Sequence, residues 1–409
     1  MRPPMPCRLR ALGMVNALGS GADEIWPRLL AGDQSGLTPR DDLVPGRSML
    51  VGDVKTALPD LPAALRRYRC RNNALSLAAL TQIERELRAT LAAVGPARVG
   101  VVMGTSTSGV SDAEAALRHH AVHGRLAPGF DYPQLEFGGA AGFVGAWVGA
   151  AGPVYTLSTA CSSGARALAS ARSLLALGVC DAVVAGGTDT LCGLTTNGFS
   201  ALQAVSNELP NPMSQNRQGL TLGEGSAVFL VTRESGGIQL EGVGESSEAH
   251  HMSAPDPEGL GAETAMRQAL HDAQLAPGDV AYVNLHGTGT PLNDAMESAA
   301  VVRVFGETTP CSSTKALVGH TLGAAGAMEA AFCWLALAEA ESGELALLPH
   351  VWDGRRDPAL AKLRLADKGE RAPVRGAVHL LTNSFGFGGN NCTLILGRDL
   401  SRPRPDFSC

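Results

Sequence analysis

The sequence has no excess of basic residues, few aromatic side chains and no long apolar run. Its 409 residues carry 33 Lys and Arg against 39 Asp and Glu, which gives a net charge of −6. Nucleic-acid-binding domains usually carry a basic excess, so this balance argues against a nucleic-acid partner. It leaves room for a small basic patch that binds an acidic protein partner. Only 4% of residues are aromatic but 49 are glycine, a composition that favours closely packed helices and sharp turns over a β-sandwich.

The nine cysteines are scattered along the chain, and no two have Cys-x-x-Cys spacing. A disulfide framework or a structural zinc site would need paired cysteines. We therefore expect free thiols, no metal site and a cytoplasmic location. The N-terminus lacks the apolar core of a signal peptide. The most membrane-like stretch, Gly138 to Gly152, is too short and glycine-rich to span a bilayer, which predicts a buried helix and no membrane span.

Strand-like apolar runs alternate with glycine-rich turns and alanine-rich helical segments. In the first half, a strand over 153–157 leads into the turn STACSSG, followed by a helix with apolar positions at Ala165, Leu168, Ala169, Leu175 and Val179. A strand over 182–185 then ends at two glycines. This order predicts mixed α/β layers.

The second half repeats this order. A strand over 281–285 enters HGTGT, a helix is expected over 327–340, and strands over 377–381 and 392–396 flank a glycine-rich turn. The charged stretch 353–370 is expected to be a solvated loop and helix face. We divide the chain between strands at 227–231 and 238–240, into halves 1–235 and 236–409.

Cys161 lies where a strand ends, small polar residues turn the chain and a helix begins. Unpaired amides and the helix dipole at such a position favour a thiolate, so the pattern indicates a nucleophile. The alternative from this segment alone is a buried cysteine that acts as a small apolar residue.

Two histidines favour the catalytic interpretation. His286 follows a strand and begins a glycine-threonine turn, and His320 lies in a glycine-lined segment five residues after Lys315. A single histidine is more often structural, but two in such turns indicate acid–base or electrostatic chemistry. By contrast, simple surface placement explains the remaining candidates, His119, His120, His123, His250 and His251.

Four segments, STACSSG, HGTGT, STKALVGHTLGAAG and NSFGFGGNN, occur in this order. They resemble the signature segments of the β-ketoacyl-[acyl-carrier-protein] synthases, in the elongating Cys-His-His branch of the thiolase superfamily. The likeness extends over most of the chain. It implies a thiolase-type fold, two similar α/β halves in a five-layer αβαβα arrangement, with Cys161 in the first half and both histidines in the second.

The resemblance also implies a reaction. Cys161 would accept an acyl group, and His286 and His320 would stabilise the enolate formed when a malonyl thioester loses carbon dioxide. The resulting carbanion would then attack the acyl group. The backbone N–H groups of Cys161 and Phe387 would form the oxyanion hole.

The family supplies roles for further residues of this chain. Lys315, with Glu329 in support, would bias protonation near the second histidine. Thr288 and Thr290 match threonines that bind the phosphopantetheine arm, although on turn preferences alone they are equally well turn residues. Phe385 and Phe387 match a mobile gate beside the thiol, and core aromatics are the alternative.

No cofactor is expected, because phosphopantetheine arrives on the carrier protein. Some relatives hold a monovalent cation near residues that correspond to Asn284, Glu329 and Asn383. The expected partners are an acyl carrier protein and a second subunit, in a homodimer or a homologous heterodimer.

The chain departs from the common fatty-acid pattern at several places. Segment 211–220 lacks the usual acidic residues, Asn293 stands where glycine is usual, and segment 104–109 is slightly altered. These changes resemble synthases of pigment or aryl-polyene-type pathways. They leave open whether the chain acts in fatty acid, polyketide or aryl-polyene biosynthesis.

Three alternatives are weaker. A degradative thiolase would carry a second catalytic cysteine in a late Cys-x-Gly turn, where this chain reads NSFGFGGNN. An initiating synthase would carry Cys-His-Asn. A non-catalytic chain-length factor typically lacks the nucleophilic cysteine, so Cys161 favours a catalytic chain. Such a chain can still form a dimer with a non-catalytic partner of this kind.

Overall fold

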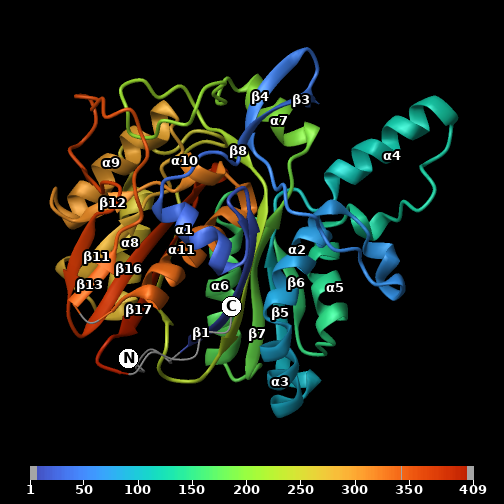
Figure 1. The fold of residues 1–409 in the computed structure, drawn as a ribbon, viewed down its shortest axis with the longest axis horizontal. Helices are drawn as coiled ribbons and strands as arrows, with labels where there is room; N and C mark the ends of the chain where they lie inside the picture. Colours follow the sequence, from blue (N-terminus) through green and yellow to red (C-terminus); the bar gives the residue numbers. More distant parts are fainter. Residues whose placement is uncertain (1–6, 342, 403–409) are drawn as a thin grey trace.

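The computed structural model describes residues 7–341 and 343–402. Its main sheet consists of two halves, called half-sheets below (Figure 1). The first runs in the order β1 (Arg8–Asn16), β9 (Gly225–Thr232), β7 (Ala182–Asp189), β5 (Val99–Gly104) and β6 (Val154–Leu157). The second runs in the order β10 (Gln239–Ser247), β17 (Asn390–Asp399), β16 (Ala377–Gly386), β11 (Val280–Asn284), β12 (Pro310–Ser312) and β14 (Arg364–Leu365). They join where Arg8 of β1 pairs with Gln239 of β10.

Helices lie between the half-sheets and on both outer faces. Helices α6 (Ser163–Ala176) and α11 (Ala325–Glu339) pack against each other and against strands of both half-sheets. Helices α2 (Arg71–Gln82) and α5 (Phe137–Val148) cover the first half-sheet, and α8 (Leu260–Ala273) covers the second, with α9 (Pro291–Phe305) packed on α8. This is the expected five-layer αβαβα arrangement, which confirms the predicted fold class.

The remaining elements are shorter or peripheral. The other helices are α1 (Ala22–Leu30), α3 (Glu84–Val94), α4 (Val110–His123), α7 (Gly193–Ala201) and α10 (Lys315–Val318), with 3-10 turns η1 (Ala63–Tyr68), η2 (Pro96–Arg98), η3 (Tyr132–Gln134), η4 (Pro277–Asp279), η5 (Leu322–Ala324) and η6 (Phe387–Gly389). The other strands are β2 (Gly19–Ser20), β3 (Leu37–Val44), β4 (Arg47–Gly52), β8 (Leu222–Gly223), β13 (Gly343–Ala346) and β15 (Arg371–Val374). In Figure 1, α4 projects from the body of the protein.

Small residues allow the two central helices to approach closely. A Cβ atom added to Gly164 of α6 would lie 2.9 Å from Cβ of Ala327, and one added to Gly326 of α11 would lie 2.7 Å from Cβ of Ala165. Both distances are below normal van der Waals contact, so glycine is required at this crossing. The stretch Leu322–Glu339 is long and apolar enough to cross a membrane by length and composition, but 94% of it is buried within the protein. It is the core helix, and the predicted buried helix over 138–152 is the shorter α5.

Several sequence predictions need correction. The helix after Cys161 ends at Ala176, so Val179 lies beyond it and is 41% exposed. Strand β7 does not end at its two glycines but continues to Asp189, because Gly186 packs against β9, where a Cβ atom would lie 2.0 Å from the carbonyl oxygen of Ala227. No helix forms within 353–370, all of which the structure describes; the segment is loop with the short strand β14.

The segment chosen as the boundary connects β9 to β10, which belong to different half-sheets. The division into 1–235 and 236–409 remains a prediction.

Candidate active site

Cys161 lies in the turn between β6 and α6, with 5% of its surface exposed. The preceding residue, Ala160, has φ of +54°, a conformation that is strained for a residue with a side chain. The hydroxyl of Ser163 stabilises the turn: it donates to the carbonyl of Ala160 at 2.6 Å and accepts from the N–H of Thr159 at 2.9 Å. Local hydrogen bonds thus hold the thiol at the start of the central helix.

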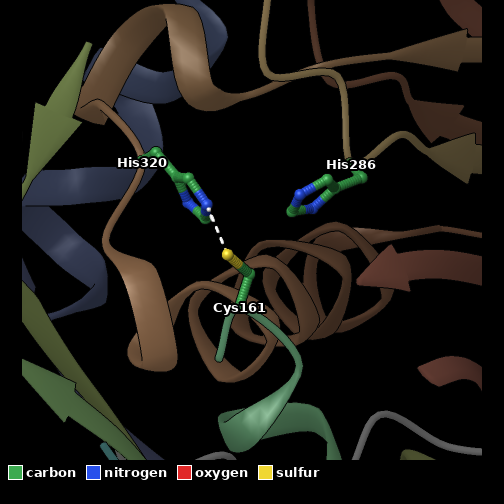
Figure 2. Close-up of side chains that lie close together, drawn as sticks. All are labelled: Cys161, His286 and His320. Atoms are coloured by element: carbon green, nitrogen blue, oxygen red, sulfur yellow. Dashed lines mark hydrogen bonds between the residues drawn. The ribbon is translucent and has the colours of Figure 1, made fainter. Parts of the chain in front are cut away.

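Two histidines from distant segments meet this thiol (Figure 2). His320 Nε2 lies 3.0 Å from Cys161 Sγ. The rings of His286 and His320 are 5.2 Å apart between centroids and nearly perpendicular, at 85°. The thiol and one nitrogen of each imidazole all lie within 4.8 Å of one another. The three residues expected to act together therefore form one cluster.

Buried charged groups on neighbouring helices fix His286. The carboxylate of Glu297, on α9, accepts the backbone N–H groups of His286 and Gly287, both at 2.7 Å. The ammonium of Lys315 donates to the His286 carbonyl at 2.5 Å and lies 3.3 Å from its Nδ1. An ammonium can only donate, so this contact places the proton of a neutral His286 on Nε2. The sequence interpretation missed Glu297, which lies in the second turn of α9, beyond the first-turn positions where an acidic residue is a recognisable signal.

His320 is fixed by the first half of the chain. Its backbone N–H donates to the carbonyl of Thr221 at 2.7 Å, and its carbonyl accepts the N–H of Gly223 at 2.9 Å. These two contacts hold the histidine beside β8 in a bridge between Leu222 and His320. A histidine that is encoded in the second half is thereby positioned against the nucleophile of the first.

Lys315 forms a buried ion pair with Glu329 of α11. Their side chains are 5% and 4% exposed. Burial raises the pKa of Glu329 to about 7, and the charge and hydrogen bond of Lys315 oppose that shift. The predicted support of Lys315 by Glu329 thus corresponds to a direct contact.

Burial dominates the electrostatics of the cluster. It raises the pKa of the Cys161 thiol to about 11, against the opposing charge of Lys315 and a hydrogen bond from the Phe387 backbone. Burial, followed by the charge of Lys315, holds the pKa values of His286 and His320 well below the usual range for histidine. At neutral pH the resting cluster is therefore a thiol and two neutral imidazoles. The thiolate expected from the helix dipole alone is not the resting form.

A cavity of about 280 Å³ opens onto the three side chains, and both threonines and both phenylalanines predicted to bind substrate line it. The hydroxyls of Thr288 and Thr290 lie 2.9 Å apart. The Phe385 ring lies 6.0 Å from that of His286, and the Phe387 ring lies 5.4 Å from that of Phe199 on α7. Phe199, which the sequence interpretation missed, thus places α7 against the predicted gate.

The expected oxyanion donors also converge. The N–H of Phe387 hydrogen-bonds the Cys161 sulfur. A Cβ atom on Gly386 would lie 3.0 Å from the Thr159 carbonyl and 3.3 Å from the Cys161 nitrogen. The absence of a side chain at this glycine lets the segment that carries Phe387 pack closely against the turn that carries Cys161.

The three residues of the possible cation site carry suitable oxygens. Within the described residues, Asn284 Oδ1 and Glu329 Oε2 are buried without a hydrogen-bond partner, whereas Asn383 Oδ1 accepts from Thr393 at 2.9 Å. Buried unpaired oxygens are costly, and a hard monovalent cation would satisfy them. Asn284 Oδ1 and Glu329 Oε2 are therefore the two oxygens of this set that are free to contact such an ion, while Glu329 Oε1 is held by Lys315.

Other histidines lie outside the cavity. The five attributed to the surface are exposed or partly exposed, as expected. His350, also missed, is buried: its Nδ1 accepts the N–H of Ser313 at 3.1 Å and its Nε2 donates to the carbonyl of Pro212 at 3.0 Å. Because Ser313 in turn donates to the Gly287 carbonyl at 2.6 Å, His350 supports the turn that carries His286.

Two family models match adjoining parts of the chain. The N-terminal domain of the β-ketoacyl synthases matches residues 68–236, and their C-terminal domain matches residues 238–343. Among curated relatives, 3-oxoacyl-[acyl-carrier-protein] synthase 2 of Coxiella burnetii is 32% identical over 414 aligned residues, which cover 95% of this chain and 98% of the relative.

Solved structures agree with this assignment. A ketosynthase from Xenorhabdus doucetiae, solved in complex with its chain length factor, superimposes with a TM-score of 0.90 at 43% identity, over 96% of this chain and 98% of the other. A β-ketoacyl synthase from Burkholderia phymatum superimposes with a TM-score of 0.83 at 31% identity, over 96% and 99%.

Proposed function

The chain belongs to the β-ketoacyl synthase family and is a 3-oxoacyl-[acyl-carrier-protein] synthase, an acyltransferase; we propose that it is the catalytic subunit of a heterodimer with a homologous chain-length-factor-like protein. The 3.0 Å contact between Cys161 and His320, beside His286, supports the catalytic assignment. The proposed substrates are an acyl chain and a malonyl group, each carried as a thioester on an acyl carrier protein.

The first step is acyl transfer to Cys161. The thiol has a raised pKa, so its sulfur becomes nucleophilic as its proton passes to the departing sulfur of the carrier, while the Nε2–H of His320 donates to Cys161 Sγ at 3.0 Å. The sulfur forms a bond to the acyl carbonyl carbon, and the thiolate of the carrier leaves with a proton. The N–H groups of Cys161 and Phe387 stabilise the oxyanion; one such donor is typically worth about 10²–10³ in rate.

The second step is decarboxylation of the malonyl thioester. The bond to the carboxylate breaks, carbon dioxide leaves, and the electron pair forms an enolate whose oxygen accepts N–H donors from His286 and His320. Neutral imidazoles suit this role, because the lowered pKa values keep them uncharged while each retains one N–H. The enolate carbon then attacks the acyl-Cys161 carbonyl, and the sulfur leaves as the new carbon–carbon bond forms.

The cavity walls serve binding and access. Thr288 and Thr290 present hydroxyls that bind the polar arm of the malonyl carrier. Phe385 and Phe387 control the access of the acyl chain to the cavity beside Cys161. Exposed arginines of η1 and the residue after it, Arg66, Arg67 and Arg69, offer the small basic patch that suits an acidic carrier protein.

An edge strand and an apolar surface support a second subunit. Strand β6 ends the first half-sheet, immediately before the turn that carries Cys161. Apolar side chains are exposed on β6 itself, on α5, which packs against it, on η3, which contacts α5, and on α4, which contacts η3; they are Leu117, Val122, Tyr132, Phe137 and Val154. Monomeric proteins rarely leave a sheet edge and an apolar patch together in solvent.

The heterodimer is favoured over a homodimer by the similarity to the Xenorhabdus doucetiae ketosynthase, which was solved with its chain length factor. The altered segment 211–220, which resembles that of synthases of aryl-polyene-type pathways, favours aryl or polyunsaturated acyl chains over saturated ones. Two aromatic side chains, those of Phe199 and Phe387, line the cavity together with Cys161, and their rings suit planar substrates. We also propose a cytoplasmic location, which the free thiols of the described cysteines support.

The subunit proposal is tested with the chain purified alone and co-expressed with a homologue that lacks the nucleophilic cysteine. Light scattering should give a one-to-one complex, and only the complex should form a β-keto product, two carbons longer, from aryl acyl carrier and malonyl carrier. Val154→Asp, at the 37% exposed edge position, should prevent assembly, whereas Leu177→Asp, a 78% exposed residue at the end of α6, should not. A homodimer that condenses fully without any partner would refute the heterodimer.

The primer proposal is tested by intact-protein mass. Aryl, polyenoyl and saturated acyl carriers of matched length are incubated with the complex, and acylation of Cys161 is followed over time. Equal or faster acylation by the saturated carriers would overturn the aryl or polyene assignment and leave the synthase activity intact.

A further inference from the structure

Asp189, the last residue of β7, is a completely buried carboxylate beside the catalytic cluster. It accepts hydrogen bonds from the hydroxyls of Thr105 and Thr107, at 2.6 and 2.7 Å, and from the N–H groups of Ser106 and Thr107, both at 2.8 Å. A further N–H, from Gly323, lies 2.5 Å away. All of these donors are uncharged. A buried carboxylate is costly unless it is fully hydrogen-bonded, so such a site indicates a specific task.

These donors come from both halves of the chain. Residues Thr105 to Thr107 follow β5 in the first half, and Ser106 also donates from its hydroxyl to the carbonyl of Ala160, the residue before the nucleophile, at 3.4 Å. Gly323 belongs to η5 in the second half and lies three residues after His320. One carboxylate therefore joins the segment beside Cys161 to the segment that carries His320.

The packing around Gly323 leaves no room for a side chain. A Cβ atom at this position would lie 2.7 Å from Asp189 Oδ2 and 2.7 Å from the Ser106 nitrogen. Leu322, between His320 and this contact, has φ of +50°. The segment after His320 thus adopts a strained conformation that needs a fixed contact on its far side.

The charge of Asp189 has the wrong sign for activating the thiol. Its negative charge raises the pKa of Cys161, adding to the effect of burial. An isosteric uncharged residue would make the thiol more acidic, so thiol activation does not account for a carboxylate here. Asp189 therefore contributes by holding its neighbouring segments in place. The N–H of Gly323 needs an acceptor, and an ionised carboxylate can accept from four or more donors.

We propose that Asp189 is a positioning residue that holds His320 in register with Cys161 by binding Gly323 across the two halves of the protein. This inference rests on the proposed role of His320 in decarboxylation. It concerns a residue that touches neither substrate nor the reacting atoms.

The test measures two half-reactions separately in Asp189→Asn: acylation of Cys161 by an acyl carrier, and decarboxylation of malonyl carrier. The amide has the same shape but one acceptor fewer, and its NH₂ group opposes the backbone donors. A displacement of His320 by about 1 Å should lower decarboxylation about 100-fold. Acylation should fall less than about fivefold, because the turn that holds Cys161 has its own hydrogen bonds.

Two comparisons make the result decisive. Asp272→Asn alters a carboxylate that also accepts a backbone N–H, that of Val243 at 2.8 Å, but lies outside the cavity lining, and both half-reactions should be unchanged. His320→Ala reports on the underlying role: if it leaves decarboxylation intact, the proposed role of His320 fails. If it abolishes decarboxylation while Asp189→Asn does not, the positioning role alone fails.

A loss of both half-reactions in equal proportion would make Asp189 merely structural and overturn the proposal. If Asp189→Asn does not fold, Thr107→Val replaces it. This variant removes one hydroxyl donor but keeps the Thr107 N–H, and it should lower decarboxylation more than acylation, by about threefold. Equal effects on both reactions, or none, would reject the positioning role.

Discussion

His320 Nε2 lies 3.0 Å from Cys161 Sγ, although 159 residues separate them in sequence. The two residues belong to different halves, and the backbone of His320 is hydrogen-bonded to Thr221 and Gly223 of the half that carries Cys161. This cross-half contact brings the nucleophile and an imidazole together in a closed, low-dielectric site. Cys161 accepts the acyl group, and the two imidazoles serve decarboxylation of the malonyl carrier, so substitutions in the cluster should affect these two steps differently.

Cys161→Ala should abolish condensation but retain decarboxylation of malonyl carrier, because both imidazoles remain in place. Product analysis by mass spectrometry and carbon dioxide release measure the two reactions. Cys180→Ala, at another buried thiol, is the matched control and should change neither. Undiminished condensation by Cys161→Ala would contradict the nucleophile assignment.

His286→Ala should lower decarboxylation by about 10²–10³, the usual effect of losing one donor to a developing oxyanion. Acylation of Cys161 should change much less, because His320 and not His286 contacts the sulfur. His350→Ala tests whether disturbing the support of the same turn has a weaker effect in the same direction. A protein that can no longer be acylated would assign His286 a different role.

Lys315→Met should make the thiol less acidic. The positive charge of Lys315 lowers the pKa of Cys161, so its removal raises that pKa above about 11 and reduces the thiolate fraction at any lower pH. The alkylation rate with iodoacetamide, followed from pH 7 to 10, should therefore fall at every pH.

The same substitution should raise the pKa values of both histidines, because the charge of Lys315 lowers them. The imidazoles would then begin to protonate at a higher pH, and the acid limb of the decarboxylation profile should move upward. Lys362→Met, on the surface, should alter neither profile. Faster alkylation in Lys315→Met, with an unchanged melting temperature, would disprove this electrostatic role.

Gly386→Ala should impair acylation without unfolding the protein. The new methyl group would lie 3.0 Å from the Thr159 carbonyl and 3.3 Å from the Cys161 nitrogen, where it displaces the oxyanion donors. Loss of one donor predicts a decrease of about 100-fold in the acylation rate. Gly138→Ala, in α5 with open space around its added carbon, is the control and should be silent. Equal acylation by both variants would exclude the expected oxyanion hole.

Thr288→Val and Thr290→Val should raise KM for malonyl carrier by about tenfold each, the amount expected for a lost hydrogen bond of about 1.4 kcal/mol. The acylation rate with the primer should stay within about twofold, since binding of the second substrate follows acylation. Steady-state kinetics with malonyl carrier as the varied substrate make the comparison. An unchanged KM in both variants would contradict binding of the malonyl carrier by the two threonines and would mean that they only form the turn.

Local sequence patterns determined much of this site. Cys161, His286 and His320 each lie in a short turn of glycine and small polar residues that follows or precedes a regular element. Such turns depend on neighbours in sequence, so their residues identify them without a structure. Alternating strand and helix patterns likewise predicted mixed α/β layers, because burial imposes a period on each element, whereas the five-layer arrangement was predicted from the resemblance to the family.

Tertiary structure decided what those turns do. Asp189 accepts backbone N–H groups from Thr107 and Gly323, which lie 82 and 134 residues away in sequence, and no local pattern shows that a carboxylate will be enclosed in this way. The length of β7 was misjudged for the same reason, since its glycines serve close packing against β9 and do not end the strand.

The protonation states were also beyond the sequence. A helix start favours a thiolate, yet enclosure of Cys161 raises its pKa to about 11, because desolvation of the charge outweighs the charge of Lys315 and the hydrogen bond from the Phe387 backbone. The sequence by itself determined which chemical groups are present and the turns that present them. Only the tertiary structure decided their distances, their solvent exposure and therefore their charge, because these depend on contacts between the two halves of the chain.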